Sequence, residues 1–401
     1  MNLRTFENYS VIILGFFVNH DVSMYISKAN TYALKKIVVS VTNDLVIDQR
    51  VSRICDSLMK AGFDITLIGR KLKDSPPIKK PYKTCRFKLI FNKGPFFYAE
   101  FNIRLFFYLL FLKTDIYLSN DLDTLPANYY ASIIRRKKLV YDSHEFFTEL
   151  PEVINRKFVK SFWQSIENSI MPHILFSYTV CKLIAYTYNN KYGINMEVLR
   201  NLPLRKSINK NEVQDEVYPR KIIIYQGALN IGRGIELVIE AMQYIEGAEF
   251  WIVGTGYMEN ELKKIVIRKG LTNKIYFKGR IPFEELYKIT MQTHLGVSLE
   301  ENLGLNYYYA LPNKLFDYIQ AEVPVLTSDF PEMSKIVNSY EIGTTISNRD
   351  PKNVASVIIN MLNNEKQRSF WKTNLKKAAS ELCWENEEKK LLDFYMKIIN
   401  D

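Results

Sequence analysis

The chain has 401 residues, of which 47% are hydrophobic and 24% charged. This composition is typical of a globular protein of two or three domains, and it argues against a disordered, collagen-like or coiled-coil chain. The 54 basic and 43 acidic residues give a formal net charge of +11, so we expect an anionic partner: a phosphorylated ligand, an anionic lipid or a nucleic acid.

The cysteines and histidines are too scattered to indicate a disulfide framework or a metal centre. No CxxC pair occurs among the four cysteines, which fits a reducing compartment. No apolar run reaches the roughly 20 residues that a membrane-spanning helix needs. The apolar stretch 11–18 lacks the basic start and the cleavage site of a signal peptide. We therefore expect a cytoplasmic protein without a resident metal or cofactor.

The first half of the chain alternates between strand and helix patterns. Residues 37–42 (IVVSVT) predict a buried parallel strand, 48–61 a helix that ends before Gly62, and 63–68 a second strand. Such a strand–helix–strand unit implies a parallel sheet. The alternation continues with predicted strands at 115–119, 138–141 and 174–180 and predicted helices at 122–136 and 156–170.

The polar segment 201–219 has no apolar periodicity and contains two prolines, so it predicts a linker between two domains. After it the alternation starts again, with strands expected at 221–225, 249–253, 275–278, 295–298 and 324–327. Helices are expected at 234–245, 257–269, 283–291 and 313–320, and 351–400 is mostly helical.

This pattern predicts two doubly wound α/β domains with a cleft between them. Ligands bind at the carboxyl ends of the strands in such sheets. The predicted divisions are an N-terminal extension (1–35), an N-terminal domain (36–200), the linker (201–219), a C-terminal domain (220–380) and a C-terminal helix (381–401).

The segment 226–234 (QGALNIGRG) lies directly between a predicted strand and a predicted helix. Glycines there let backbone N–H groups approach an anion, and the helix N-terminus adds its dipole. Arg233 can place two hydrogen bonds on phosphate oxygens. A tight strand-to-helix turn without a ligand is the alternative interpretation.

The segment 311–318 (LPNKLFDY) begins a second predicted helix of chemical interest. Lys314 and Asp317 are three residues apart and therefore share a helix face. A cation in the first turn opposes the helix dipole, as if it were held for an anionic ligand, and a carboxylate one turn later can accept hydrogen bonds from a ribose diol. The alternative is an ordinary surface ion pair.

Two polar segments follow strands of the first half. Asp142, His144 and Glu145 stand at the end of one strand, where they are well placed for proton transfer or for binding hydroxyl groups. A structural histidine with satisfied hydrogen bonds is the alternative. The loop after the first strand also faces the expected cleft, although Asp48 could simply cap a helix. Its polar residues are Asn43, Asp44, Asp48 and Arg50.

Taken together, these segments resemble the retaining glycosyltransferases of family 4, which have the GT-B fold. The resemblance covers roughly residues 36–380 and rests on the order and spacing of seven segments. They are VTNDLVIDQRV (41–51), SNDLDTLPA (119–127), VYDSHEFFTE (140–149), YQGALNIGRG (225–234), VGTG (253–256), FKGRIPFEEL (277–286) and LPNKLFDYIQAEVPV (311–325). It implies two Rossmann-like domains facing each other across a cleft.

The resemblance also implies sugar transfer from a nucleotide sugar, UDP- or GDP-linked, to a glycan or a polyprenyl-linked acceptor in bacterial cell-surface polysaccharide biosynthesis. The catalytic residues implied by position are Arg233, which would hold the donor diphosphate, Lys314, and His144, near the transferred sugar. The expected donor-binding residues are Gly227, Arg233, Gly254, Arg280, Asn313, Lys314 and, for the ribose, Asp317. The expected acceptor-side residues are Asn43, Asp44, Asp48, Arg50, Asp142 and Glu145.

Three departures from the family pattern concern the same site. The family often has Gly-Arg where this chain has Gly227-Ala228, so one diphosphate arginine is missing. Asp317 is one methylene shorter than the family's glutamate. The family's first glutamate falls on Tyr309, and the candidate replacements are Glu300, Glu301 and Asn306.

We expect no metal, because fixed cations would neutralise the leaving diphosphate. Asp121-Leu122-Asp123 mimics a metal-binding DxD motif, but it opens a predicted helix and is interpreted as a cap or an acceptor-side feature. Residues 70–93 are strongly basic and precede an aromatic helix at 96–112, so 70–112 could dock on an anionic membrane. The alternative is a helix packed on the first sheet beside a solvated basic loop.

Three rival functions stay open at this point. A nucleotide-sugar epimerase of the same fold would use similar donor chemistry. A non-catalytic protein that still binds a nucleotide sugar would fit Ala228 and Tyr309. Nucleic-acid binding ranks lowest, because no RNA- or DNA-binding module is recognisable.

Overall fold

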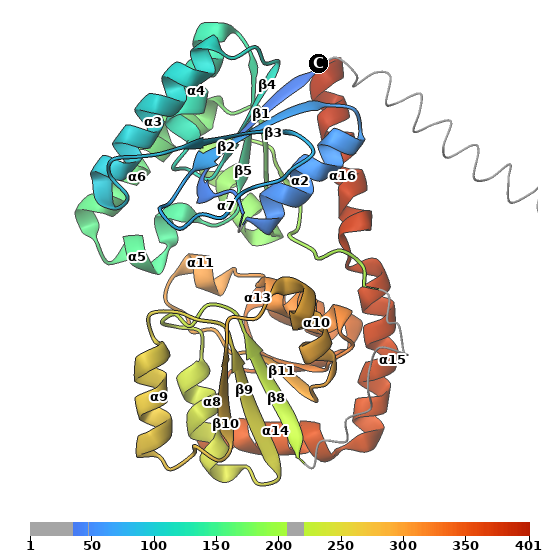
Figure 1. Cartoon of the computed structure of the whole chain (residues 1–401). Helices are drawn as coiled ribbons and strands as arrows, with labels where there is room; N and C mark the ends of the chain where they lie inside the picture. Colours follow the sequence, from blue (N-terminus) through green and yellow to red (C-terminus); the bar gives the residue numbers. More distant parts are fainter. Residues whose placement is uncertain (1–34, 47, 207–219) are drawn as a thin grey trace, which may run out of the picture.

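The computed structural model describes residues 35–46, 48–206 and 220–401, which form two α/β domains, one above the other in Figure 1. The predicted N-terminal extension, apart from residue 35, and most of the predicted linker lie outside the described residues.

The N-terminal domain is built on a seven-stranded parallel sheet in the order β3-β2-β1-β4-β5-β6-β7. The inner strand β1 is buried on both faces, because its side chains alternate between two apolar clusters: Ile37 and Val39 face one cluster, and Val38 faces the other. The strands are β1 (Lys36–Asp44), β2 (Asp64–Arg70), β3 (Lys83–Phe87), β4 (Ile116–Asn120), β5 (Lys138–Ser143), β6 (Phe176–Thr179) and β7 (Met196–Val198).

Helices cover both faces of this sheet. One face carries α2 and the C-terminal α16, whose apolar residues share a core with β1 and β2. The other face carries a layer that includes α3, α4, α6 and α7. The helices of this domain are α2 (Gln49–Lys60), α3 (Gly94–Phe111), α4 (Leu125–Arg135), α5 (Pro151–Ile154), α6 (Lys157–Ile170) and α7 (Lys182–Tyr192).

The C-terminal domain repeats the architecture with a six-stranded parallel sheet in the order β10-β9-β8-β11-β12-β13. Its strands are β8 (Lys221–Gln226), β9 (Ala248–Val253), β10 (Ile275–Gly279), β11 (Leu295–Ser298), β12 (Val325–Ser328) and β13 (Gly343–Ile346). Its helices are α8 (Ile235–Ala241), α9 (Glu259–Arg268), α10 (Phe283–Met291), α11 (Leu305–Tyr308), α12 (Asn313–Gln320), α13 (Pro331–Tyr340), α14 (Pro351–Asn363) and α15 (Glu365–Glu381).

The last helix, α16 (Trp384–Asn400), crosses back to the N-terminal domain. The indole Nε1 of Trp384 donates a hydrogen bond to Ser57 Oγ of α2 at 2.9 Å, and Tyr395 packs edge-on against Phe63. The end of the chain therefore completes the core of the first domain.

The predicted fold class is confirmed: two Rossmann-like parallel-sheet domains face each other. The sequence predicted most of the strands, but it missed β3, β7 and β13 as well as helices α5, α7, α11 and α13. In both sheets the second and third strands lie on one side of the first strand, and the strands from the fourth onward lie on the other side. This reversal of strand order puts a ligand-binding crevice at the carboxyl ends of the strands.

Candidate active site

Two glycine-rich turns bring the carboxyl ends of β8 and β9 together. A Cβ atom on Gly254 would lie 1.9 Å from the carbonyl oxygen of Gly227, and Gly254 has a φ of +130°. A Cβ atom on Gly234, at the start of α8, would lie 1.8 Å from the carbonyl oxygen of Leu299. A side chain at these positions would force the loops apart, so glycine is what allows the loop 227–234 to pack closely against the loop after β11.

Arg233 ends this loop with a guanidinium that has no hydrogen bond or ion pair within the described part of the chain. The group stacks over the ring of Tyr307, with its central carbon 4.8 Å from the ring centroid. Burial would lower its pKa, but Tyr307, Glu300 and Glu145 raise it. Arg233 is thus a fixed, half-buried cation whose five donors are available to an anionic ligand.

Lys314, in the first turn of α12, is buried and pairs with Glu300. Its Nζ lies 2.7 Å from Glu300 Oε1 and 4.3 Å from the centroid of the Tyr225 ring. Ser298 Oγ donates to the other carboxylate oxygen of Glu300 at 2.8 Å. Burial would raise the pKa of Glu300, but Lys314 and Arg233 hold it below its usual range. The alternative of a surface ion pair between Lys314 and Asp317 is therefore wrong.

The candidates for the missing glutamate lie in different places. Glu300 is fully buried beside Lys314, whereas Glu301 lies on the surface, 3.5 Å from Arg349. The amide of Asn306 accepts a hydrogen bond from the backbone N–H of Phe146, which links the two domains at 2.8 Å. Of these residues, Glu300 is the carboxylate in contact with the predicted donor site.

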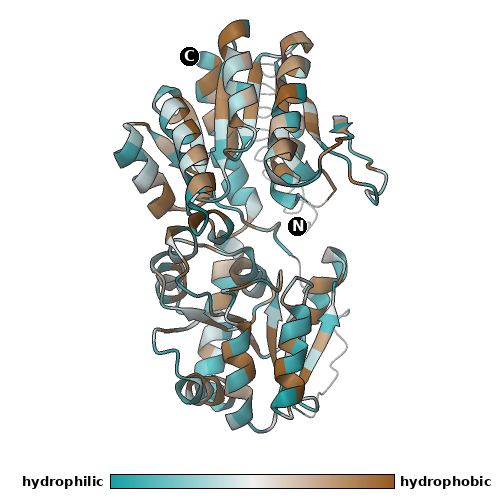
Figure 2. Cartoon of the chain, turned by 90° about the vertical axis from the view of Figure 1, so that its left-hand side faces the viewer, coloured by the Kyte–Doolittle hydropathy of each residue, from teal (hydrophilic) through white to brown (hydrophobic). Residues whose placement is uncertain are grey.

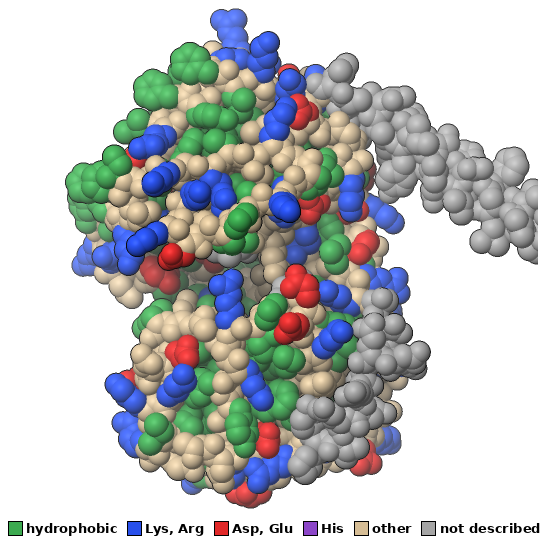
Figure 3. All heavy atoms as spheres, viewed as in Figure 1, with side chains coloured by type: hydrophobic (Ala, Val, Ile, Leu, Met, Phe, Trp, Pro, Cys, Tyr) green, Lys and Arg blue, Asp and Glu red, His purple; other side chains and the backbone are tan. Residues whose placement is uncertain are grey.

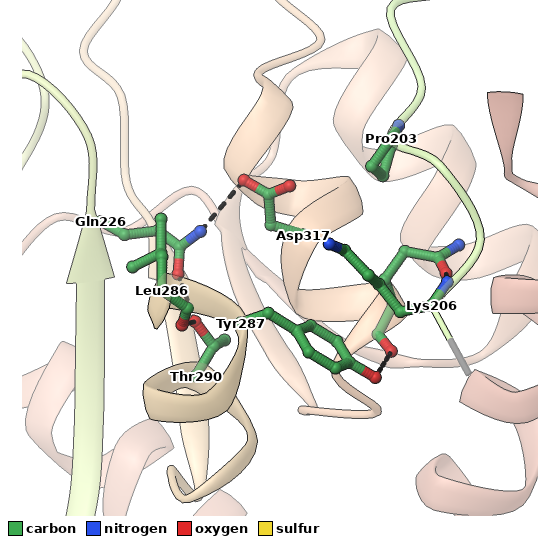
Figure 4. A pocket seen from close by; sticks show the side chains of 8 residues that line it. Pro203, Lys206, Gln226, Leu286, Tyr287, Thr290 and Asp317 are labelled. Carbon is green, nitrogen blue, oxygen red and sulfur yellow. Dashed lines mark hydrogen bonds between the residues drawn. The ribbon is translucent and has the colours of Figure 1, made fainter. Parts of the chain in front are cut away.

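Asp317 lies one turn after Lys314 and faces a narrow pocket (Figure 4). Its Oδ2 accepts a hydrogen bond from Gln226 Nε2 at 3.0 Å, and Thr290 Oγ1 donates to Gln226 Oε1 at 2.8 Å. Burial raises the pKa of Asp317 to about 6, against the lowering effects of Gln226, Arg53 and Lys206. The other lining residues are Pro203, Leu286, Tyr287 and Gln320.

The remaining residues predicted to bind the donor lie at the edge of the site. Asn313 is exposed, and its Oδ1 accepts from Asn201 Nδ2 at 2.9 Å. Arg280 is exposed in the loop after β10. Gly254 N–H donates to the carbonyl of Gly279 at 2.8 Å, which fixes that loop beside β9. Their proposed contacts with a donor stay predictions.

On the N-terminal side, His144 follows β5 and lies between two carboxylates. Its Nε2 is 3.0 Å from Asp142 Oδ2, and its Nδ1 is 3.5 Å from Asp121 Oδ2. Burial alone would lower the pKa of His144, but Asp142 and Asp121 outweigh it and raise the pKa to about 9. The imidazole is therefore protonated at neutral pH. Nε2 has a hydrogen-bond partner in Asp142, as the structural interpretation expected, whereas Nδ1 has only the longer contact with Asp121, and the side chain keeps 15% of its surface exposed.

Arg50 is bound to Asp142 on the buried side of this cluster. Its Nη2 and Nε lie 2.9 and 3.2 Å from the two oxygens of Asp142, and its Nη1 donates to the carbonyl of Leu199 at 3.0 Å. The side chains of Arg50 and Asp142 are 3% and 0% exposed. Direct contact with an acceptor, as predicted for these two residues, is excluded in this structure. They are positioning residues for His144.

The loop after β1 divides into a capping part and an exposed part. Asp48 accepts from the backbone N–H of Val51 and caps α2, as the alternative interpretation expected. Asp44 is buried against Ser75 and lies 3.6 Å from Arg86. Asn43 and Glu145 are exposed and can still meet an acceptor.

The DxD-like segment takes part in the same cluster. Asp121 adopts a φ of +58°, and its Oδ1 accepts from the backbone N–H of His144 at 2.8 Å. Asp123 Oδ2 accepts from Thr42 Oγ1 at 2.6 Å. Burial raises the pKa of Asp121 to about 7 and that of Asp123 to about 6. The sequence marked these residues only as a cap or an acceptor-side feature and missed the contact of Asp121 with His144.

The two clusters come from opposite domains, and Figure 3 shows a hollow between these domains. Arg233 and Glu145 are close enough to influence each other's pKa. A free cation at a glycine-rich helix start, a buried lysine and a protonated histidine thus surround one crevice. This arrangement can bind a diphosphate and, beside it, a polyhydroxylated group.

Comparison with known proteins agrees with this architecture. Residues 207–378 match the family described as Glycosyl transferases group 1. The C-terminal domain of the chain therefore belongs to that family; the narrower assignment to family 4 stays a prediction. An uncharacterized glycosyltransferase of Methanocaldococcus jannaschii is 26% identical over 211 residues. That match covers 51% of this chain and spans half of the relative's length.

Solved structures match over both domains. The sucrose-phosphate synthase of Thermosynechococcus elongatus superposes with a TM-score of 0.74 at 15% identity, covering 91% of this chain and 99% of that one. The Anabaena protein HepE, solved in complex with UDP-glucose, gives a TM-score of 0.70 at 13% identity over 90% of this chain and 99% of its own. These likenesses show the fold, which is GT-B.

Proposed function

We propose that this protein is a retaining glycosyltransferase that moves a hexose from a UDP- or GDP-linked sugar to a glycan or lipid-linked acceptor. The proposal places it at the cytoplasmic side of the membrane in bacterial cell-surface polysaccharide synthesis. The observation that carries the sugar-transfer proposal is the guanidinium of Arg233, which has no hydrogen bond or ion pair among the described residues, on the other domain from the protonated His144. The group 1 domain supports the reaction class, and the UDP-glucose complex of HepE supports a uridine donor.

In this proposal the C-terminal domain holds the donor. The diphosphate lies on the guanidinium of Arg233 and on backbone N–H groups of the loop 227–234, with the Lys314 ammonium behind it. Glu300 holds the Lys314 side chain in place, with its Oε1 2.7 Å from Nζ. The ribose diol reaches Asp317, which already accepts one hydrogen bond from Gln226. As the sugar bond breaks, these fixed cations stabilise the negative charge that develops on the diphosphate, so no metal is required.

His144 contributes a hydrogen-bond donor rather than a base. Its pKa of about 9 keeps both ring nitrogens protonated at neutral pH. Nδ1 is held less tightly than Nε2, because it lies 3.5 Å from its carboxylate instead of 3.0 Å. The Nδ1–H group is therefore the one available to a hydroxyl of the transferred sugar.

A thermal-shift screen of nucleotide sugars tests donor binding directly. A donor that binds the folded state raises the melting temperature in a concentration-dependent way. We expect the shift with the wild type and its loss in Arg233→Ala and Asp317→Ala. Arg268→Ala, an exposed change at the end of α9, serves as the matched control and should keep the shift. An equal shift in the Arg233→Ala variant would contradict the proposed diphosphate site.

Transfer itself is tested with the donor found in that screen and a panel of acceptors. We expect nucleotide diphosphate release that depends on the acceptor, persists in excess EDTA and gives a product with the anomeric configuration of the donor by NMR. Sugar interconversion without an acceptor would indicate an epimerase instead. Donor binding without turnover across the panel would indicate a non-catalytic binding protein.

A further inference from the structure

The outer face of the N-terminal domain exposes an unusual amount of apolar surface. Three helices of one layer, α3, α4 and α6, present large hydrophobic side chains to solvent, and Phe111 and Phe158 are 83% and 86% exposed. Green atoms gather on the left edge of this domain in Figure 3, where Figure 1 places these helices. The exposed side chains of this outer face are Phe96, Ile103, Phe107, Phe111, Tyr130, Ile133, Ile134, Phe158 and Phe162.

Helix α3 is apolar on two opposite sides. Its inner stripe, which includes Phe101 and Leu105, packs on the sheet, as in any helix that covers a core. Its opposite side repeats Ile103, Phe107 and Phe111 at four-residue spacing, so a second apolar stripe faces outward. A surface helix normally carries polar residues there. Figure 2 shows the resulting brown segments on the helices of the upper domain.

Basic residues flank the apolar stripes at both ends. Lys93 lies just before α3, and Lys157 is the first residue of α6. Lys113 follows the end of α3, and Arg136 follows the end of α4. All four side chains are exposed. None of these cations has an ion pair among the residues that the structure describes. Of the nearby acids, Glu100 accepts from the backbone of Ile90 and Phe91 and pairs with Arg104, and Glu149 pairs with Lys160. The exposed Glu152 is one negative charge against these four cations. The rim therefore carries an uncompensated positive charge.

We propose that the outer face of α3, α4 and α6 docks on an anionic lipid bilayer. The phenyl and aliphatic side chains enter the boundary between headgroups and acyl chains, and the basic rim binds lipid phosphates. The charge complementarity of this rim selects a membrane over an uncharged apolar partner. The attachment is interfacial: among the described residues, no helix combines the length and hydrophobicity needed to cross a membrane.

In the structure, only part of the segment 70–112, which the sequence predicted to contact a membrane, lies on this outer face. Lys80 Nζ contacts Ser52 Oγ of α2, on the opposite face of the sheet, at 3.0 Å. The docking face therefore uses α3 but not this part of the basic loop, and it adds α4 and α6, which the sequence did not indicate.

The position of the docking face relative to the crevice follows from the helix before α6. The segment 149–154, which includes α5, lies beside Gly304 of the C-terminal domain, so α6 begins at the mouth of the crevice. Docking would hold that opening next to the lipid surface. This suits a lipid-linked acceptor, but the docking itself rests on the surface alone and not on the proposed sugar transfer.

Cosedimentation of the full chain with vesicles tests the proposal. We expect binding to phosphatidylcholine vesicles that contain phosphatidylglycerol, at low salt, and weaker binding to phosphatidylcholine alone. Phe111→Gln/Phe158→Gln should lower the partition coefficient about 100-fold, at roughly tenfold for each phenyl group withdrawn from the interface. Lys113→Gln/Lys157→Gln should lower it about 25-fold.

Matched variants keep the test specific. Ile267→Gln/Phe370→Gln removes exposed apolar side chains from α9 and α15, and Lys60→Gln/Lys389→Gln removes exposed charges from α2 and α16. Both should bind vesicles like the wild type, with all melting temperatures alike. Failure of the wild type to bind, or equal losses in the control variants, overturns the proposal. So does a dimer that the phenylalanine substitutions dissociate without any change in vesicle binding. A protein that binds vesicles but no nucleotide sugar would contradict only the proposed sugar transfer.

Discussion

The two sides of the crevice differ in how completely their charged residues are paired. On the N-terminal side, Arg50, Asp142, His144 and Asp121 form a continuous chain in which each charge already has a protein partner. On the C-terminal side, Lys314 is paired with Glu300, but the guanidinium of Arg233 stacks on an aromatic ring and has no hydrogen bond or ion pair among the described residues. On the first side each charge of the chain has a partner, whereas on the second side the guanidinium of Arg233 is open to a ligand.

This difference indicates a division of labour. A buried chain of ion pairs fixes the position and protonation of His144 before any ligand arrives, because moving one member would leave a charge unpaired in the interior. An unpartnered guanidinium gains its hydrogen bonds only when an anion binds. Mutations on the two sides should therefore separate: those on the first should affect stability, and those on the second should affect binding and rate.

Breaking the chain at Arg50 should have the largest effect. Arg50→Met leaves Asp142 fully buried and without its bidentate partner, which typically costs about 3–5 kcal/mol. The free energy of unfolding from urea titration measures the loss. Arg280→Met, an exposed change, should alter it by less than about 0.5 kcal/mol. Similar, small losses in both variants would mean that the buried pair does not hold this side together.

The opposite behaviour is expected of Arg233→Ala. No hydrogen bond within the described residues is lost, so stability should fall by no more than about 1 kcal/mol, the size of an exposed cation–π contact. If Arg233 stabilises the departing diphosphate, kcat/KM should fall about 10²–10³-fold. Steady-state kinetics beside urea titration gives both numbers. A variant that loses stability but keeps its rate would reverse the comparison.

The pH dependence of stability sharpens the contrast at His144. Its pKa is raised from 6.5 to about 9, so its contribution to stability is fully present below pH 6.5 and is lost as the pH rises through about 9. We expect the wild type to exceed His144→Asn by about 2 kcal/mol at pH 6 and by much less at pH 10. Unfolding titrations across this range measure the gap, and a gap independent of pH would refute the raised pKa.

Much of this fold was predictable because parallel strands buried on both faces leave continuous apolar runs. Residues 37–42 and 295–298 are such runs, and both were placed correctly. Strand β3 (KTCRF) was missed because it is an edge strand with no fully buried residue. The edge strands β7 and β13 were missed for the same kind of reason: they are short and mostly only partly buried.

The site was predictable only in part. Arg233 and Asp317 stand in segments whose order along the chain is informative. The partner of Arg50 is 92 residues away, and nothing in either segment points to the other. Glu300 was one of three candidates, and only the turn of the chain between β11 and α12 brings it to Lys314. Tertiary contacts of this kind decide which polar residues are buried supports and which stay open to a ligand.

The smallest expected effect concerns Asp317, whose substitution should change both stability and donor binding. Burial raises its pKa from 3.8 to about 6 in the folded state. Above about pH 6 the carboxylate is therefore ionised in a buried place, which lowers the free energy of unfolding, because the unfolded chain ionises it without this cost. Asp317→Asn removes this cost and can still accept the hydrogen bond from Gln226. After allowance for solvent screening, we expect a gain of about 1 kcal/mol at pH 8 and none at pH 3. The same change should weaken the donor-induced thermal shift, because a neutral amide is a poorer acceptor for a ribose diol. A variant that is both more stable and tighter in donor binding would show that Asp317 does not meet the ribose.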